Sequence, residues 1–131
     1  MAVFVDTSGI LAASDRDDKH HELAVEAFSK AVEQRLRLAT HSMVITECSA
    51  LMHRRLGHRV ALAFLDSLSR FDVYWLDQEL FADALARFRL GSPKGLSLVD
   101  CASFELMNLL SLRTYIGIDR HFEREGFQPL V

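Results

Sequence analysis

The chain has 131 residues, a formal net charge of −3 and a hydrophobic content of 50%. This length fits one domain, and the apolar content is sufficient for a continuous buried core. No apolar run approaches the ~20 residues that cross a bilayer, and no basic region precedes an apolar one at the start, so we expect neither membrane insertion nor secretion by a signal peptide.

The first stretch, Ala2 to Val5, is short, apolar and rich in β-forming residues, and it stops at Asp6. We predict a buried strand that places Asp6 at its C-terminal edge, which is where open parallel sheets bind ligands. Ser8 is suited to cap the short helix that follows. Asp18 is suited to cap the next one, an amphipathic helix from Lys19 to about Gln34.

A second strand, Arg37 to Thr40, precedes a helix that Ser42 can cap and Gly57 can end. On this helix Glu47 shares a stripe with the apolar residues three positions before it and four positions after it. A carboxylate on the inward face of a helix needs a reason, such as a bound cation. The alternative is a boundary glutamate whose carboxylate reaches water, and position alone leaves both interpretations open.

The pattern continues with a helix from His58 to Ser69, a third strand from Asp72 to Leu76 and a helix that Asp77 can cap. Residues Gly91 to Gly95 hold one of the two prolines and predict a loop. Within this loop Lys94 is a candidate contact for an RNA phosphate.

The segment from Ser97 to Asp100 matches the capping-box pattern, in which the side chains at the two ends bond each other's backbone amides. That pattern gives Asp100 a structural role without any chemistry. Against a purely structural role, Asp100 shares one helix face with Leu96 and Phe104, and Glu is the usual residue at this position of the box. Both roles stay open from the sequence.

A fourth strand, Thr114 to Ile118, is predicted to end in Asp119, as the first strand ends in Asp6. Asp119 is also suited to cap a turn of helix that follows it. Residues Phe127 to Val131 predict a short last strand.

The two cysteines, Cys48 and Cys101, lie within apolar helical patterns and do not form a CxxC motif. We expect both to be reduced and buried, where cysteine behaves as a small hydrophobe. This cysteine usage favours a cytoplasmic protein.

Strands that alternate with helices predict right-handed crossovers and one parallel sheet that helices cover on both faces. In such an α/β fold four carboxylates are expected at the C-terminal edge of the sheet: Asp6, Glu47, Asp100 and Asp119. Clustered carboxylates repel one another unless a cation is present, and hard oxygen ligands suit Mg²⁺ or Mn²⁺. Sites of this kind typically serve phosphoryl chemistry, because the metal activates water and neutralises charge in an in-line displacement. With these four negative charges set aside the net charge of −3 becomes +1, so composition does not exclude RNA.

Short motifs stand in order along the whole chain and carry a family likeness: Val5-Asp6-Thr7-Ser8-Gly9, Thr46-Glu47, Leu96-Ser97-Leu98-Val99-Asp100-Cys101-Ala102-Ser103-Phe104 and Ile118-Asp119-Arg120-His121-Phe122. Together they resemble the PIN-domain nucleases and, within these, the VapC-type toxins of VapBC toxin-antitoxin pairs. The sequence departs from many such relatives at Ser42, where they carry Asn or Asp. The departure concerns residues around the site rather than the four acids.

The resemblance implies a single PIN domain over residues 1–131, with a three-layer α/β/α fold and strand order 3-2-1-4-5. It implies that Asp6, Glu47, Asp100 and Asp119 are both the catalytic residues and the metal ligands. It further implies Mg²⁺- or Mn²⁺-dependent hydrolysis of RNA, a homodimer, and inhibition by a cognate antitoxin protein.

Other functions stay open at this point. A PIN nuclease of RNA maturation or of DNA flaps would share the acidic residues, and a neighbouring antitoxin gene would distinguish the toxin. A Mg²⁺-binding signalling receiver also clusters acids at the ends of parallel strands, but it needs an adjacent acidic pair after the first strand and a late strand-end lysine, which this sequence lacks. The remaining alternative is a binding module without nuclease activity.

Overall fold

The computed structural model describes residues 1–91 and 95–131, so the predicted phosphate contact Lys94 lies outside the described residues. Its centre is one parallel sheet with the order β3-β2-β1-β4-β5, which confirms the predicted fold class and strand order. The strands are β1 (Ala2–Val5), β2 (Arg37–His41), β3 (Phe71–Tyr74), β4 (Thr114–Ile116) and β5 (Gln128–Pro129).

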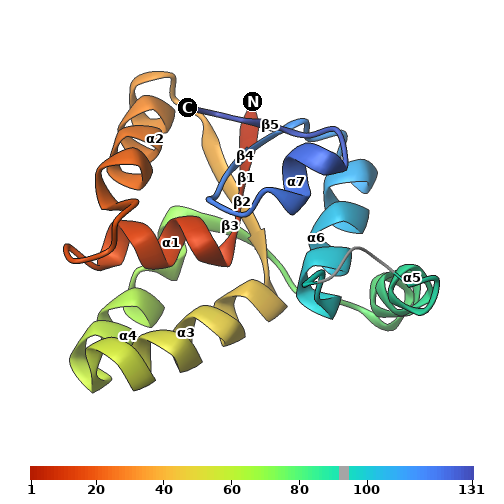
Figure 1. Cartoon of the computed structure of the whole chain (residues 1–131), viewed down its shortest axis with the longest axis horizontal. Helices are drawn as coiled ribbons and strands as arrows, with labels where there is room; N and C mark the ends of the chain where they lie inside the picture. The colour runs from red at the N-terminus through yellow and green to blue at the C-terminus, as the bar shows by residue number, and fades with distance from the viewer. Residues whose placement is uncertain (92–94) are drawn as a thin grey trace.

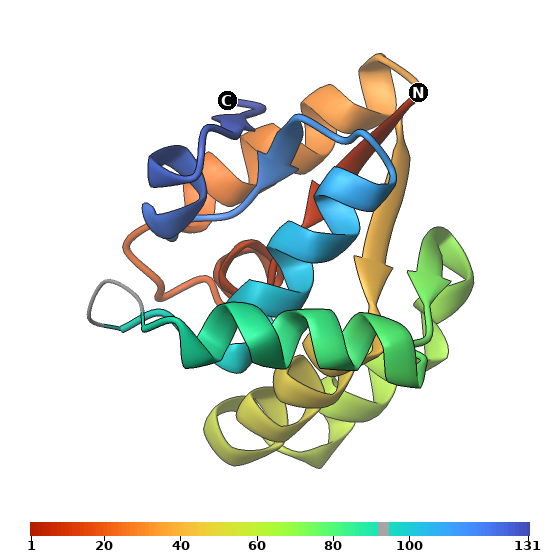
Figure 2. The same ribbon diagram turned by 90° about the vertical axis from the view of Figure 1, so that its right-hand side faces the viewer.

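Helices cover both faces of this sheet. Figure 1 shows α1 to α4 on one side of the strands and α5 to α7 on the other, and Figure 2 looks onto the layer that holds α5 and α6. The helices are α1 (Thr7–Ser14), α2 (His21–Glu33), α3 (Ser42–Leu56), α4 (His58–Asp66), α5 (Gln78–Arg89), α6 (Leu98–Leu109) and α7 (His121–Arg124), with a 3₁₀ turn η1 (Leu68–Arg70). None of the helices in the described ranges has the length and apolar character to cross a membrane.

Strand β1 is buried on both faces, which explains its unbroken apolar sequence. Val3, Phe4 and Val5 each have no solvent exposure. Because successive side chains of a strand point to opposite faces, a strand covered by helices on both sides needs apolar residues at every position. Phe4 packs against Phe122 of α7, with 6.0 Å between the ring centres.

Helix α7 is very short and is anchored by one aromatic side chain. Phe122 is fully buried. Its ring centre lies 4.8 Å from that of Tyr115 in β4 and 4.9 Å from that of Phe104 in α6. These contacts fix the depth at which α7 sits in the core, although the helix itself has only 4 residues.

The predicted N-caps at the first three helices were wrong. Asp6 caps α1 instead of Ser8, and His41 caps α3 instead of Ser42. In both cases the helix follows its strand directly, so the last extended residue supplies the capping atom. Helix α2 starts at His21, and Asp18 instead accepts a hydrogen bond from the amide of His20 at 2.8 Å.

Several predicted boundaries also shift. Strand β4 ends at Ile116, so Asp119 follows the strand by three residues instead of ending it. The next amide that could continue the strand, that of Ile118, donates to the hydroxyl of Ser8 at 2.9 Å. Strand β3 begins and ends earlier than predicted, β5 is shorter, and α4 ends at Asp66 before the 3₁₀ turn.

Candidate functional site

The order in which strands are added to the sheet reverses between β1 and β4. The first of the predicted carboxylates, Asp6, lies at this point. From β1 the chain builds β2 and β3 on one side, and it then returns to add β4 and β5 on the other. Ligands of open parallel sheets bind at such a switch point, at the C-terminal ends of the strands. Asp6 follows β1 immediately, and its amide donates to the carbonyl of Ile116 at 2.9 Å.

Asp6 is buried, with 3% of its surface exposed. One carboxylate oxygen, Oδ2, accepts hydrogen bonds from the Ser8 hydroxyl at 2.7 Å and from the Ser8 amide at 3.2 Å. Burial raises the pKa of Asp6 to about 7, the Ser8 bonds oppose the rise, and the negative charges of Asp100 and Asp119 add to it. The ionised form of Asp6 is therefore costly in the metal-free protein.

Asp100 combines the two roles that the sequence left open. The capping box is present, since the Ser97 amide donates to Asp100 Oδ2 and the Asp100 amide donates to the Ser97 hydroxyl, both at 3.1 Å. Burial raises the pKa of this carboxyl, the bond from the Ser97 amide lowers it, and the charge of Asp119 raises it further. Asp100 thus caps α6 and also faces a second carboxylate.

Asp119 lies in the loop between β4 and α7. Its Oδ1 accepts the amide of His121 at 2.9 Å, and the imidazole Nε2 of His121 is 3.9 Å from the same oxygen. The charge of Asp119 raises the pKa of both Asp6 and Asp100. The three aspartates therefore form one electrostatic group at the sheet edge.

Glu47 is supplied by α3, the helix that follows β2. It is partly exposed on α3 and lines a surface hollow together with Met43, Ala50 and Val99. Burial raises the pKa of the Cys48 thiol to about 12, and the charges of Asp6 and Glu47 both contribute. Glu47 is not among the charges that act most on Asp6 and Asp100, so its membership of the site stays a prediction.

Both cysteines are free and buried, as predicted.

Ser8, predicted only as a helix cap, links two segments at this edge, and Gly117, which no sequence signal singled out, leaves the space that the link needs. The Ser8 hydroxyl donates to Asp6 and accepts from the amide of Ile118, so it joins β1 to the loop that carries Asp119. A Cβ atom at Gly117 would lie 3.1 Å from the Cβ of Asp6 and 3.2 Å from the Ser8 hydroxyl. The Asp-x-Ser spacing is a local signal for the first bond, but the second bond spans 110 positions and has no local signal.

In residues 1–91 and 95–131, no three or more His, Cys, Asp or Glu side chains are spaced to hold a metal ion. The chemistry of the donors nevertheless fits a divalent cation. One oxygen of each aspartate accepts a backbone amide, and no hydrogen bond from a described residue reaches the other oxygen. Beside Asp6, the buried hydroxyl of Thr7 also has no partner among the described residues. Hard oxygens with unrelieved mutual repulsion suit Mg²⁺ or Mn²⁺.

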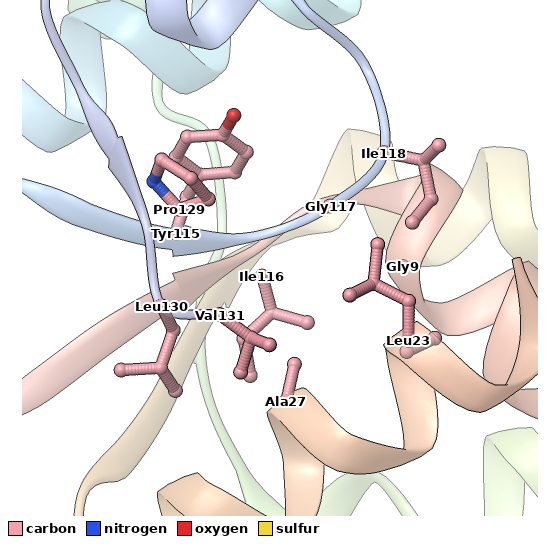
Figure 3. Close-up of a pocket in the computed structure, with 11 residues that line it drawn as sticks. Gly9, Leu23, Ala27, Tyr115, Ile116, Gly117, Ile118, Pro129, Leu130 and Val131 are labelled. Atoms are coloured by element: carbon pink, nitrogen blue, oxygen red, sulfur yellow. The ribbon is translucent and has the colours of Figure 1, made fainter.

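A second hollow lies on the α2 side of β4 and β5 and differs in character. Figure 3 shows Ile116 and Val131 pointing toward Ala27 of α2. Among the side chains of the described residues that line it there is no carboxylate, histidine or cysteine. This hollow therefore lacks the side-chain ligands that metal sites most often use.

Comparisons with known proteins identify a family and a similar solved structure. The family model described as the PIN domain matches residues 3–124. The crystal structure of VapC20 from Mycobacterium tuberculosis, described as a toxin that cleaves the sarcin-ricin loop, is similar to this chain with a TM-score of 0.87 and 26% sequence identity over 96% of each chain. A comparison with curated proteins found no match.

Proposed function

The chain belongs to the PIN domain family, and from this we propose that it is an endoribonuclease that requires Mg²⁺ or Mn²⁺. The observation that carries the proposal is the group of three mutually repelling aspartates at the switch point of the sheet. Asp6, Glu47, Asp100 and Asp119 are the proposed catalytic residues and metal ligands. The likeness to VapC20, which is described as cleaving an RNA loop, supports RNA as the substrate.

The residues of this chain supply positions and charges for the reaction. Ser8 orients Asp6, the Ser97 amide orients Asp100, and the His121 amide orients Asp119, so each carboxylate has one constrained oxygen. When bound, a divalent cation would lower the pKa of water and neutralise charge that develops on the phosphate. Holding three buried or half-buried carboxylates together before the cation binds lowers the free energy of unfolding. Function tolerates this cost because the cation needs the negative charge.

We further propose that the protein is the toxin of a type II pair in the cytoplasm, that it forms a homodimer and that a cognate antitoxin inhibits it. The likeness to the toxin VapC20 over nearly all of both chains supports this. An antitoxin can inhibit by placing an arginine among the carboxylates, because a guanidinium matches the geometry of a carboxylate.

The activity is tested by incubating purified protein with RNA in Mg²⁺, in Mn²⁺ and in excess EDTA. Cleavage should require either metal and stop in EDTA, since the carboxylates alone offer no positive charge to the transition state. Asp100→Asn should abolish cleavage, whereas Asp72→Asn, an exposed acid paired with Arg37, should not. Full cleavage in EDTA, or by a D100N protein purified in the same way, would contradict the proposal.

The partner is tested with the small protein encoded beside this one, if such a gene is found. Co-expression should give a complex in which cleavage is suppressed and returns when the partner is removed. A nuclease of RNA maturation or DNA repair would pass the metal test and fail this one. A tightly bound neighbour that leaves cleavage unchanged would argue against a toxin.

A further inference from the structure

One guanidinium joins α5 to α6 and to the C-terminal end of α7. Arg87, in the last turn of α5, places Nε and Nη2 each 2.8 Å from Oε2 of Glu105 in α6. Its Nη1 lies 3.0 Å from Oε2 of Glu125, the residue that ends α7. The guanidinium also lies over the ring of Phe104, 5.6 Å from the ring centre. No other arginine in the described ranges pairs with two carboxylates.

The geometry of this cluster separates it from an ordinary surface ion pair. The side chains of Arg87 and Glu105 are each 26% exposed, whereas Arg37 and Asp72 are 68% and 43% exposed and stand 3.6 Å apart. Exposed pairs contribute little because water screens them and their side chains lose freedom. A forked guanidinium with several short bonds holds its partners in a defined orientation.

Of the elements that Arg87 joins, α6 carries Asp100, and α7 follows the loop that holds Asp119. Asp100 lies in the first turn of α6, and Asp119 leads into α7, where it accepts the amide of His121. The separation of these two carboxylates therefore depends on how α7 lies against α6. At the first residue of α7, a Cβ atom on Gly95 would come within 3.3 Å of the His121 imidazole. A side chain larger than glycine at position 95 would therefore press on that end of α7.

Phe122 alone does not determine the orientation of α7. It buries the middle of the helix, and Phe127, which follows α7, is buried 5.8 Å from the ring centre of Phe104. Both of these anchors are apolar side chains on the core side of α7. The bond from Arg87 to Glu125 adds a polar attachment at the C-terminal end and links that end to α5 and α6.

We propose that Arg87 is a positioning residue that fixes α7 against α6 and thereby sets Asp119 relative to Asp100. The proposal rests on the proposed function, because it concerns the same carboxylates. Arg87 itself contacts neither of them in the structure, so it acts through Glu105 and Glu125.

The test uses Arg87→Met, which keeps an unbranched apolar stem over Phe104 and removes the guanidinium, and Glu125→Gln, which removes only the ion pair to α7. Arg37→Met removes the exposed pair with Asp72 and is the matched control. Amide hydrogen exchange in EDTA reports on α7 without metal, through the amides of Glu125 and Gly126. A titration with Mn²⁺ alone, followed by electron paramagnetic resonance, reports on the carboxylates.

In R87M and in E125Q we expect the α7 amides to exchange at least roughly fivefold faster while the β1 amides do not change, because only local opening is affected. We also expect the dissociation constant for Mn²⁺ to rise at least roughly fivefold, a change that one displaced carboxylate ligand can cause. The control should alter neither measurement. If R87M does not fold, E125Q alone decides.

Unchanged α7 exchange in E125Q would overturn the proposal, and so would faster α7 exchange with unchanged Mn²⁺ affinity, since Arg87 would then be structural only. Uniformly faster exchange over the whole chain would overturn it too. If the unaltered protein bound no Mn²⁺, the metal centre of the proposed function would fail, and hydrogen exchange in EDTA would still decide whether Arg87 holds α7.

Discussion

At the level of single residues, Ser8 connects the two segments that bring Asp6 and Asp119 to the sheet edge. Its hydroxyl donates to Asp6 Oδ2 at 2.7 Å and accepts from the amide of Ile118 at 2.9 Å. The bond to Asp6 also lowers the pKa of that buried carboxyl, against the effect of burial. One hydroxyl therefore contributes to both the geometry and the charge of the site.

Ser8→Ala should cost about 1–2 kcal/mol of unfolding free energy, because the partly buried amide of Ile118 loses its acceptor. It should also lower cleavage near neutral pH, since Asp6 ionises less readily without the donor. Denaturant unfolding and an RNase assay measure the two effects. Ser49→Ala, which removes a serine hydroxyl from α3, should stay within about 0.5 kcal/mol and keep its activity. Equal behaviour of the two variants would refute the role of Ser8.

Glu47 is the proposed ligand whose charge is not among those that act most on Asp6 and Asp100. Glu47→Gln keeps the size of the side chain and removes the charge. If Glu47 is the fourth anion, the variant should lose at least roughly tenfold in cleavage and bind Mn²⁺ more weakly, with stability within about 0.5 kcal/mol because the side chain is partly exposed. Glu26→Gln, an exposed acid on α2, is the control. Full activity of E47Q would reduce the site to three aspartates.

At the level of elements, the first turn of α6 combines a helix cap, which neighbouring residues determine, with a carboxylate at the sheet edge, which depends on the fold. The capping box at Ser97 and Asp100 follows from neighbouring residues alone, as does the cap that Asp77 provides for α5. Only the first of these caps also places a carboxylate at the sheet edge. The two caps are therefore a matched pair for separating helix stability from activity.

Ser97→Ala and Asp77→Ala should each cost ~1 kcal/mol in unfolding free energy, the usual cost of a lost N-cap. Only Ser97→Ala should also lower cleavage, because the first turn of α6 holds Asp100. Thermal unfolding in EDTA and an RNase assay in Mg²⁺ measure the two properties on the same preparations. A similar loss of cleavage in both variants would show that general destabilisation, and not the placement of Asp100, controls activity.

At the level of the whole molecule, two buried groups give stability opposite dependences on pH. Burial raises the pKa of Asp6 from 3.8 to about 7. The unfolding free energy that protonated Asp6 contributes is therefore complete below pH 3.8 and is lost as pH rises to about 7. Burial lowers the pKa of His41 from 6.5 to about 4. The stability that neutral His41 contributes is therefore complete above pH 6.5 and is lost as pH falls to about 4.

Asp6→Asn removes the first contribution and leaves the second. In EDTA, the unfolding free energy of the variant minus that of the unaltered protein should increase as pH rises from about 4 to 7 and then level off. The total increase should be at most a few kcal/mol, because one pKa unit corresponds to about 1.4 kcal/mol. The variant itself should lose stability below pH 6.5 because of His41. Denaturant unfolding across this range measures both. A pH-independent difference would contradict the buried state of Asp6.

Local chemistry was enough to predict the features that depend on neighbouring residues. The apolar run that forms β1, the caps at Asp77 and Ser97 and the helix stop at Gly57 were predicted correctly, because each is determined by residues within a few positions. The alternation of strands and helices likewise predicted a parallel sheet covered on both faces. The strand order came from the family resemblance, since pairing of distant strands leaves no signal within either strand.

Contacts between segments that are distant in the sequence became known only from the tertiary structure. The bond that the Ile118 amide donates to Ser8 and the end of β4 before Asp119 both depend on segments that lie far apart in the chain. The same holds for Arg87, whose partners in α6 and α7 follow it by 18 and 38 positions. Composition and periodicity predict which face of an element is buried, but contacts between distant elements arise from packing, and packing is a property of the whole fold.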